Sequence, residues 1–353
     1  MFSCKPDYRA AQDRINAFWN HEDTDRPGIS LSYPRANQAP YPHKEHKNHE
    51  ERWLDFEARV AQATWYMENT VFAAEAMPVF MPDMGPSIIS AWAGCPHTFG
   101  GDTAWADPCV FDWEKDSAVM DLNHPLAKKL EEFTRLALDA AKGKYIVGLA
   151  DFHPGGDHLA ALRGPEELAI DLLENPDAVK AKLASSYEEY WRIFDFYVKW
   201  LKSEGMPIAT WLPLTSETDM YIPSNDFSCM ISKDMFDEFF LPGIVEECRR
   251  YDKSIYHLDG PGAIQHLDSL LEIPELNAFQ WVPGAGQEQV IPWRDLLNRM
   301  VAAGKSIITY PQNMADLRFL IDNFKPKGLF VNLWWVPNEA DAKDLLKLTS
   351  EWK

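Results

Sequence analysis

The sequence predicts an α/β protein built as a single (β/α)8 TIM barrel, with N-terminal insertions over the catalytic face. Eight short runs rich in Ile, Val, Phe or Tyr alternate with helical segments, and Gly, Pro or Asp bounds each run. This alternation is typical of a parallel sheet, and eight strands are the number that closes such a barrel. The expected strands are Gly28–Ser32, Met77–Met81, Tyr145–Leu149, Ile208–Leu212, Ser254–Leu258, Ala278–Val282, Ser306–Tyr310 and Gly328–Leu333.

The expected helices show apolar residues every three or four positions. Pro176–Ser203 is the clearest, because Asn175 is a favourable N-cap, Pro176 suits the first helical position and Gly205 follows the end. No GxGxxG motif follows the first strand, which disfavours the alternative of an open doubly wound sheet. The other helices are expected at Glu50–Asn69, Ser232–Arg250, Ala263–Leu271, Pro292–Ala303, Met314–Asn323 and Glu339–Trp352.

The length of 353 residues fits either two domains or one barrel with insertions. Because no linker separates the strand–helix units, we expect one domain over residues 1–353. Two strand-to-helix connections, Pro34–His49 and Pro82–Asn123, are longer than usual. Connections that follow strands lie on the catalytic face of a barrel, so both are predicted to cover its mouth.

Acidic residues outnumber basic ones by 54 to 34, which gives a net charge of −20. Nucleic acids and anionic membranes select basic surfaces, so neither is expected as a partner. The sequence has no membrane-spanning apolar stretch, no apolar signal segment near its start and no CxxC pair among its five cysteines. We therefore expect a cytoplasmic protein with free thiols, and a homo-oligomer remains open.

Polar residues lie at the predicted carboxyl ends of two strands. His257 and Asp259 follow the fifth strand, and Asp151 and His153 follow the third, each pair two residues apart. Alternate strand residues point the same way, so each pair is able to face the mouth. An imidazole with a carboxylate suits a metal, or a base with its partner. The alternative is a buried structural histidine beside a carboxylate that caps a helix.

The fourth strand ends with Glu217 and Asp219, which are predicted to join the pair on the neighbouring fifth strand. A helix or turn cap is the alternative, and it suits Asp219 better. Substrate-binding residues are expected at the later strand ends, where tryptophan is able to wall a flat apolar substrate or a sugar. Packing between strands and helices is the alternative for each aromatic residue. The predicted substrate-binding residues are Gln280, Trp281, Tyr310, Asn332 and Trp334.

Three stretches, Asp151–Val179, Asp226–Gly262 and Gly304–Asn332, resemble the uroporphyrinogen decarboxylase superfamily. That group includes the corrinoid-dependent methyltransferases. The resemblance covers roughly residues 145–353, and Asp23–Pro34 is similar to the opening strand of the family. It implies a (β/α)8 barrel with a funnel at the carboxyl ends of its strands.

The methyltransferases of this superfamily bind zinc through His-x-Cys after strand five and a Cys after the last strand. His257 matches the histidine, whereas Asp259 stands at the first Cys position and Trp334 lies near the second. A thiolate site is therefore absent, and the resemblance leaves a zinc site of His257, Asp259 and Glu217. Zinc accepts such ligands, and hard oxygen ligands suit an oxygen-bearing substrate.

The resemblance implies a methyltransferase that moves a methyl group between a small substrate and a corrinoid carried by a partner protein. The expected catalytic residues are Asp151, His153, Glu217 and Asp259. A decarboxylase or lyase acting on a small carboxylate is the first alternative, with Asp83, Asp151 or His153 as acid or base. The decarboxylases themselves use an arginine-rich N-terminal motif that is absent here. A glycoside hydrolase using Glu217 and Asp259, or a non-enzymatic sensor, are further alternatives.

Overall fold

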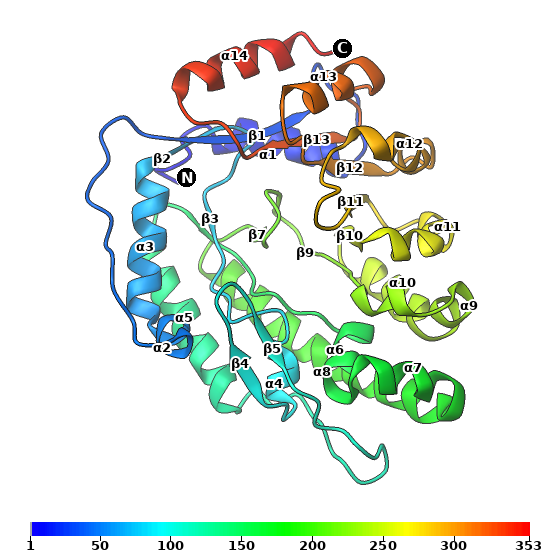
Figure 1. Ribbon diagram of the computed structural model, residues 1–353. Helices are drawn as coiled ribbons and strands as arrows, with labels where there is room; N and C mark the ends of the chain where they lie inside the picture. The colour runs from blue at the N-terminus through cyan, green and yellow to red at the C-terminus, as the bar shows by residue number, and fades with distance from the viewer. Residues whose placement is uncertain (1) are drawn as a thin grey trace.

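The largest sheet of the computed structural model, which describes residues 2–353, has seven strands in the order β2-β1-β13-β12-β11-β10-β9. All neighbouring strands are parallel except β1 and β2, which are antiparallel. Figure 1 shows these strands around the middle of the molecule and most helices outside them. The strands are β1 (Gly28–Pro34), β2 (Thr70–Ala74), β9 (Met220–Tyr221), β10 (Lys253–Asp259), β11 (Ala278–Val282), β12 (Ser306–Thr309) and β13 (Leu329–Leu333).

Three further strand pairs complete the β structure of the described chain. β3 (Val79–Phe80) pairs in parallel with β6 (Ile146–Val147). The Leu149 amide, which follows β6, donates to the Ala209 carbonyl of β7 at 2.8 Å and so links these two strands. All eight expected strand regions contain a strand, although several are short. Within residues 2–353 the hydrogen-bonded ladders do not form one closed ring. The antiparallel pairs are β4 (His97–Phe99) with β5 (Ala104–Ala106), and β7 (Ile208–Ala209) with β8 (Thr215–Ser216).

The strand that pairs with β10 differs from the one the sequence predicts. β7 turns back into β8, and β9 takes the place beside β10, with Met220 opposite Lys253. The pairing extends beyond β9, because Ser224 forms a parallel bridge with His257. This register brings residues after 224 to the carboxyl end of β10.

The predicted helical ranges are largely helical, and α8 and α13 match them in full. α1, α4, α5, α6 and α7 lie outside those ranges and were not predicted from the sequence. The expected helix Glu50–Asn69 is divided because the Asp55 side chain accepts from the Ala58 amide and caps a new helix. None of the helices in the described chain is long and apolar enough to cross a membrane. The helices are α1 (Tyr8–Trp19), α2 (His49–Leu54), α3 (Phe56–Asn69), α4 (Ile88–Trp92), α5 (Pro125–Ala141), α6 (Gly155–Arg163), α7 (Pro165–Glu174), α8 (Pro176–Ser203), α9 (Lys233–Met235), α10 (Leu241–Arg250), α11 (Leu267–Leu271), α12 (Arg294–Ala302), α13 (Met314–Asn323) and α14 (Glu339–Ser350).

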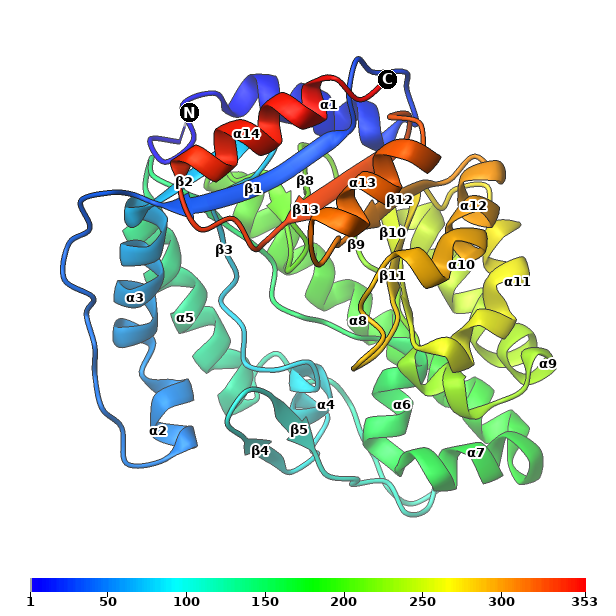
Figure 2. The ribbon, with the colours of Figure 1, turned by 45° about the horizontal axis from the view of Figure 1, so that its top comes forward.

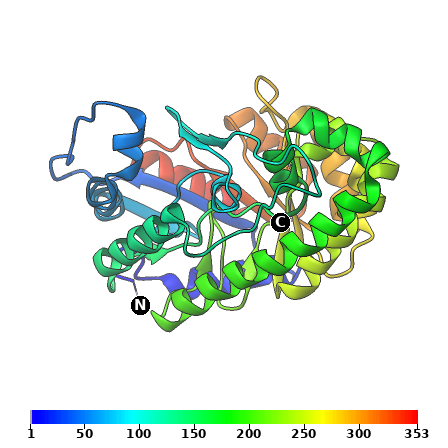
Figure 3. The same ribbon diagram turned by 90° about the horizontal axis from the view of Figure 1, so that it is seen from below.

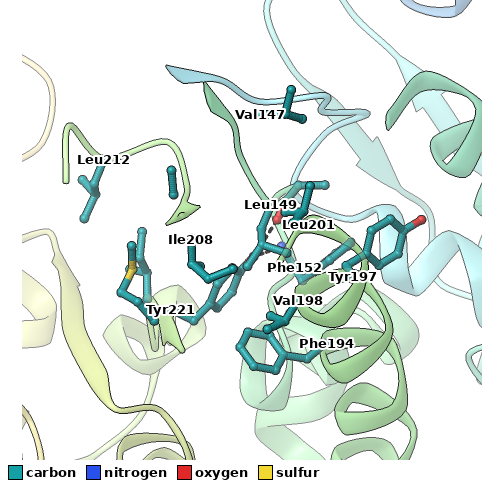
Figure 4. Close-up of a cluster of buried hydrophobic side chains, with 14 of the residues drawn as sticks. Val147, Leu149, Phe152, Phe194, Tyr197, Val198, Leu201, Ile208, Leu212 and Tyr221 are labelled. Atoms are coloured by element: carbon teal, nitrogen blue, oxygen red, sulfur yellow. Dashed lines mark hydrogen bonds between the residues drawn. The ribbon is translucent and has the colours of Figure 1, made fainter. Parts of the chain in front are cut away.

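Side chains of the large sheet alternate between two apolar clusters, as the period of a strand requires. One cluster takes Ile255, Ala278, Ile308 and Phe330, and the other takes the intervening residues Tyr256, Phe279, Ile307 and Val331. The first cluster extends to the long helix α8, which Figure 3 shows along the outside of the molecule. In Figure 4 the α8 side chains lie against those near β6, β7 and β9; the residues labelled there are Val147, Leu149, Phe152, Phe194, Tyr197, Val198, Leu201, Ile208, Leu212 and Tyr221.

The two long connections pack against different parts of the protein. The first passes along α3 (Figure 1). There, Trp65 Nε1 donates to the Ala39 carbonyl at 2.7 Å. The second contributes α4 to the core, because Ile88, Ile89 and Trp92 are at most 1% exposed. Its β4–β5 hairpin lies near α4 (Figure 2). The second connection is therefore part of the packed body, and its residues Pro86, Ser87 and Ser90 also line the small cavity described below. That the two connections cover the mouth stays a prediction.

Candidate functional site

Three polar side chains converge at the carboxyl end of β10. Asp226, His257 and Asp259 each offer a ligand atom, and these atoms all lie within 4.8 Å of one another. His257 and Asp259 share a face of β10, as predicted, because they are two residues apart. Asp226 begins the 3-10 helix Asp226–Met230, directly after the stretch that pairs with β10. The sequence shows the Asp–Phe–Ser–Cys stretch but gives no local sign that it lies beside His257.

Hydrogen bonds fix the orientation of the His257 ring. Its Nδ1 lies 2.7 Å from the Gln280 side-chain oxygen, and Gln280 Nε2 donates to the Tyr310 hydroxyl at 3.2 Å. Since an amide oxygen only accepts, Nδ1 carries a proton, and in the neutral form of the ring the lone pair is therefore on Nε2. Nε2 lies 3.8 Å from Asp226 Oδ1, and the Trp211 ring packs edge-on against the imidazole with centroids 5.1 Å apart.

A second histidine, His153, lies between two carboxylates. Its Nε2 is 2.6 Å from Asp151 Oδ1, and its Nδ1 is 2.7 Å from the Ser224 hydroxyl. That hydroxyl donates in turn to Asp157 Oδ2 at 3.1 Å. Burial lowers the pKa of His153, but the charges of Asp151, Asp157 and Asp226 outweigh burial and raise the pKa to about 10. His153 is therefore an imidazolium at neutral pH.

Two carboxyl groups around these histidines have raised pKa values. Burial, together with the charge of Asp157, raises the pKa of Asp226 to about 6 even though the side chain is half exposed. Burial and the charge of Asp151 likewise raise the pKa of Asp83 to about 6. Carboxyl groups crowded in this way take up a proton or a cation more readily than isolated ones.

His153 and Asp226 line one small cavity of about 180 Å³. His257 does not line it, but its Nε2 lies 3.8 Å from Asp226 Oδ1, so Asp226 connects the cavity to the end of β10. Ser224 joins the groups through the backbone as well, because it bridges to His257 while its hydroxyl contacts His153. The remaining lining residues are Pro86, Ser87, Ser90, Asp157 and Ala161.

A larger cavity of about 300 Å³ lies at the ends of β11 and β12. Trp281 and Trp293 meet edge to face with ring centroids 4.9 Å apart, and Trp334 forms another part of the wall. Gln280 and Tyr310 also line it, so one amide side chain touches both this cavity and His257. The structure thus groups four of the five predicted substrate-binding residues: Gln280, Trp281, Tyr310 and Trp334.

The structure does not bring Glu217 or Asn332 into these contacts. Glu217 pairs with Arg9 beside α1. It precedes β9, which lies beside the amino end of β10, whereas Asp259 ends that strand. Seven residues at about 3.3 Å each place the two ends of β10 about 20 Å apart. The metal-ligand and catalytic predictions for Glu217 are therefore wrong. Half-buried Asn332 pairs with Ser30 of β1 and does not line either cavity described above.

No family model matches the chain, and no curated protein matches it. Among solved structures it is similar to a methyltransferase from Methanosarcina mazei, with a TM-score of 0.63 and 11% sequence identity. The match covers 97% of this chain and 98% of the other. At this identity the likeness is one of fold, and it agrees with the mixed α/β architecture expected from the sequence.

Proposed function

We propose that the protein is a methyltransferase-like enzyme that holds a divalent metal at Asp226, His257 and Asp259. The observation that carries the proposal is the convergence of these three ligands at the carboxyl end of β10. The fold likeness to a methyltransferase over nearly the whole chain supports the reaction class. We further propose that the strands form a distorted (β/α)8 barrel and that residues 1–353 make one domain, with the site at the carboxyl ends of the strands.

The residues present suit zinc. One imidazole nitrogen and two carboxylates are accepted zinc ligands, and three protein ligands leave a position open for substrate. Atoms bound at about 2.0–2.2 Å in a tetrahedral site lie about 3.3–3.6 Å apart, so the 3.8 Å between His257 Nε2 and Asp226 Oδ1 needs only a small adjustment. The bond to Gln280 leaves Nε2 available. Bound zinc would act as a Lewis acid toward an oxygen of the substrate.

The two cavities have different roles in the proposed reaction. The tryptophan-walled cavity suits an apolar, flat part of a small substrate, because Trp281, Trp293 and Trp334 form much of its wall. Gln280 would orient the substrate next to His257. His153, held as an imidazolium by Asp151, supplies a proton donor on the other side of Asp226. The methyl group would pass to or from a corrinoid that a partner protein carries.

Metal analysis of purified protein variants tests the proposal. The wild type should hold about one zinc per chain after titration with zinc alone, and His257→Ala should lose it while keeping its circular dichroism spectrum. Glu217→Gln is the matched control, because this carboxylate lies at the far end of β10. Full zinc occupancy in His257→Ala, or no binding by the wild type, would overturn the site. Methyl transfer from methylcobalamin then tests the reaction class separately.

A decarboxylase or lyase is the second candidate, and the paired His153 and Asp151 favour it. An imidazolium 2.6 Å from a carboxylate is suited to donate a proton to a carbanion. Activity that survives both a chelator and His257→Ala but disappears in His153→Gln would favour this candidate. The structure disfavours a glycoside hydrolase that uses Glu217 and Asp259. The two catalytic carboxyl groups of such an enzyme lie about 5–9.5 Å apart, whereas Glu217 is at the other end of β10 from Asp259.

A further inference from the structure

Two cysteines that are 14 positions apart in the sequence meet beside the site. The Sγ atoms of Cys95 and Cys109 lie 3.1 Å apart. Cys95 follows α4 and Cys109 follows β5, so the pair closes the base of the β4–β5 hairpin. We propose that Cys95 and Cys109 form a reversible disulfide by exchange with a low-molecular-weight disulfide such as oxidised glutathione.

The backbone around the pair holds the two thiols in place. The Cys109 and Val110 amides both donate to the Leu162 carbonyl at 2.9 Å, and Cys95 Sγ lies 3.5 Å from the Ala161 carbonyl oxygen. Both cysteines are thus anchored on the last turn of α6. An S–S bond is about 2.05 Å long, so the sulfur atoms need to approach by only about 1 Å. Two thiols held in this way are prepared for intramolecular exchange.

The two thiols differ in access and in acidity. Cys109 is partly exposed, whereas Cys95 is 5% exposed. The hydrogen bond from the Cys95 thiol lowers the pKa of Cys109; the Lys182 ammonium acts in the same direction, against burial and the Asp116 charge. Cys109 is therefore the thiol that attacks an incoming disulfide, and Cys95 is the thiol that resolves the product.

The exchange takes place in two steps that conserve atoms and electrons. The Cys109 thiolate attacks one sulfur of oxidised glutathione, which forms a mixed disulfide and releases one glutathione thiolate. The Cys95 thiol loses its proton and attacks the Cys109 sulfur, which releases the second glutathione. Two protein thiols are oxidised, one glutathione disulfide is reduced to two thiols, and the two protons pass to the released thiolates.

The disulfide would act on the wall of the small cavity. Ala161, whose carbonyl contacts Cys95, lines that cavity together with His153 and Asp226. Drawing the two sulfur atoms together ties the ends of the hairpin segment to each other at this wall. The modification site does not depend on the proposed reaction, because it stands on the geometry of the two thiols alone.

Peptide mapping of the full-length protein tests the proposal. The protein is reduced, freed of reductant and equilibrated with glutathione buffers of increasing oxidised fraction. Free thiols are then blocked with N-ethylmaleimide under denaturing conditions. We expect a linked Cys95–Cys109 peptide in the wild type and in Cys229→Ser, which lacks the exposed thiol that would otherwise react alone. Cys4 and Cys248 should remain blocked by maleimide, because both are buried.

Single variants test the order of attack. Cys95→Ser should lose the linked peptide completely and accumulate glutathione on Cys109, whereas Cys109→Ser should leave buried Cys95 reduced. The proposal is overturned if Cys95 and Cys109 both stay reduced in a buffer that converts Cys229 fully to its glutathione adduct. It is equally overturned if the linked peptide appears only between two chains.

Discussion

Gln280 on β11 holds the ring of His257 on β10 through a 2.7 Å hydrogen bond between its side-chain oxygen and Nδ1. The two residues stand opposite each other in the parallel register of these strands. Both lie on the face of the sheet that carries Ala278 and Ile255, so the strand period alone orients them alike. The bond decides which ring nitrogen is free, and the free nitrogen is the one that points toward Asp226.

Replacing Gln280 should therefore weaken metal binding, although Gln280 is not itself a metal ligand. We expect Gln280→Leu to lower zinc affinity about 10–100-fold, as loss of a partner to a ligating histidine typically does. Competition with a chromophoric chelator measures this change. Gln280→Glu keeps an acceptor for Nδ1 and should retain most of the affinity. Equal affinities for wild type and Gln280→Leu would show that the ring is held in another way.

His153 should make stability depend on pH in the alkaline range. Its pKa is raised to about 10 in the folded protein, against about 6.5 in an unfolded chain. The stabilisation is then fully present below about pH 6.5 and is lost as the pH rises through about 10, because the folded state binds the extra proton. The slope from one proton is at most about 1.4 kcal/mol per pH unit.

Urea unfolding at several pH values between 7 and 10 measures this effect. His153→Gln removes the titrating ring, so the stability difference between wild type and variant should shrink as the pH rises. Burial raises the pKa of Glu247 to about 8 and the charge of His153 lowers it, so Glu247→Gln is introduced into both proteins. Titrating groups that do not interact with His153 then cancel in the difference. Parallel stability curves for the two proteins would contradict the ion pair with Asp151.

The second long connection provides a matched pair of tryptophans. Trp92 of α4 is 1% exposed and meets the Phe152 ring edge to face at 5.9 Å, whereas Trp105 of β5 is 47% exposed. Trp92→Ala should cost about 3–5 kcal/mol of unfolding free energy, because it leaves a cavity in the core. Trp105→Ala should cost less than about 1 kcal/mol. Chemical denaturation measures both, and similar losses would contradict the division of this segment into core helix and surface hairpin.

Local patterns in the sequence are sufficient for much of the framework. The apolar runs locate all eight strand regions, and the Asn175 and Gly205 signals bound α8 correctly. The two-residue period places His257 and Asp259 on one face, and strand order places Gln280 beside them. These features follow from short-range rules, because cap, period and chain order are all properties of neighbouring residues.

The composition of the site depends on pairings between distant segments. Asp226 joins His257 only because β9, rather than β7, lies beside β10, and the same register leaves Glu217 at the far end of that strand. Cys95 meets Cys109 because both ends of the hairpin are anchored on α6. The sequence by itself determined the alternation of strands and helices and the faces they present. The tertiary structure alone decided which faces meet, because hydrogen-bond register between distant strands leaves no periodic signal along the chain.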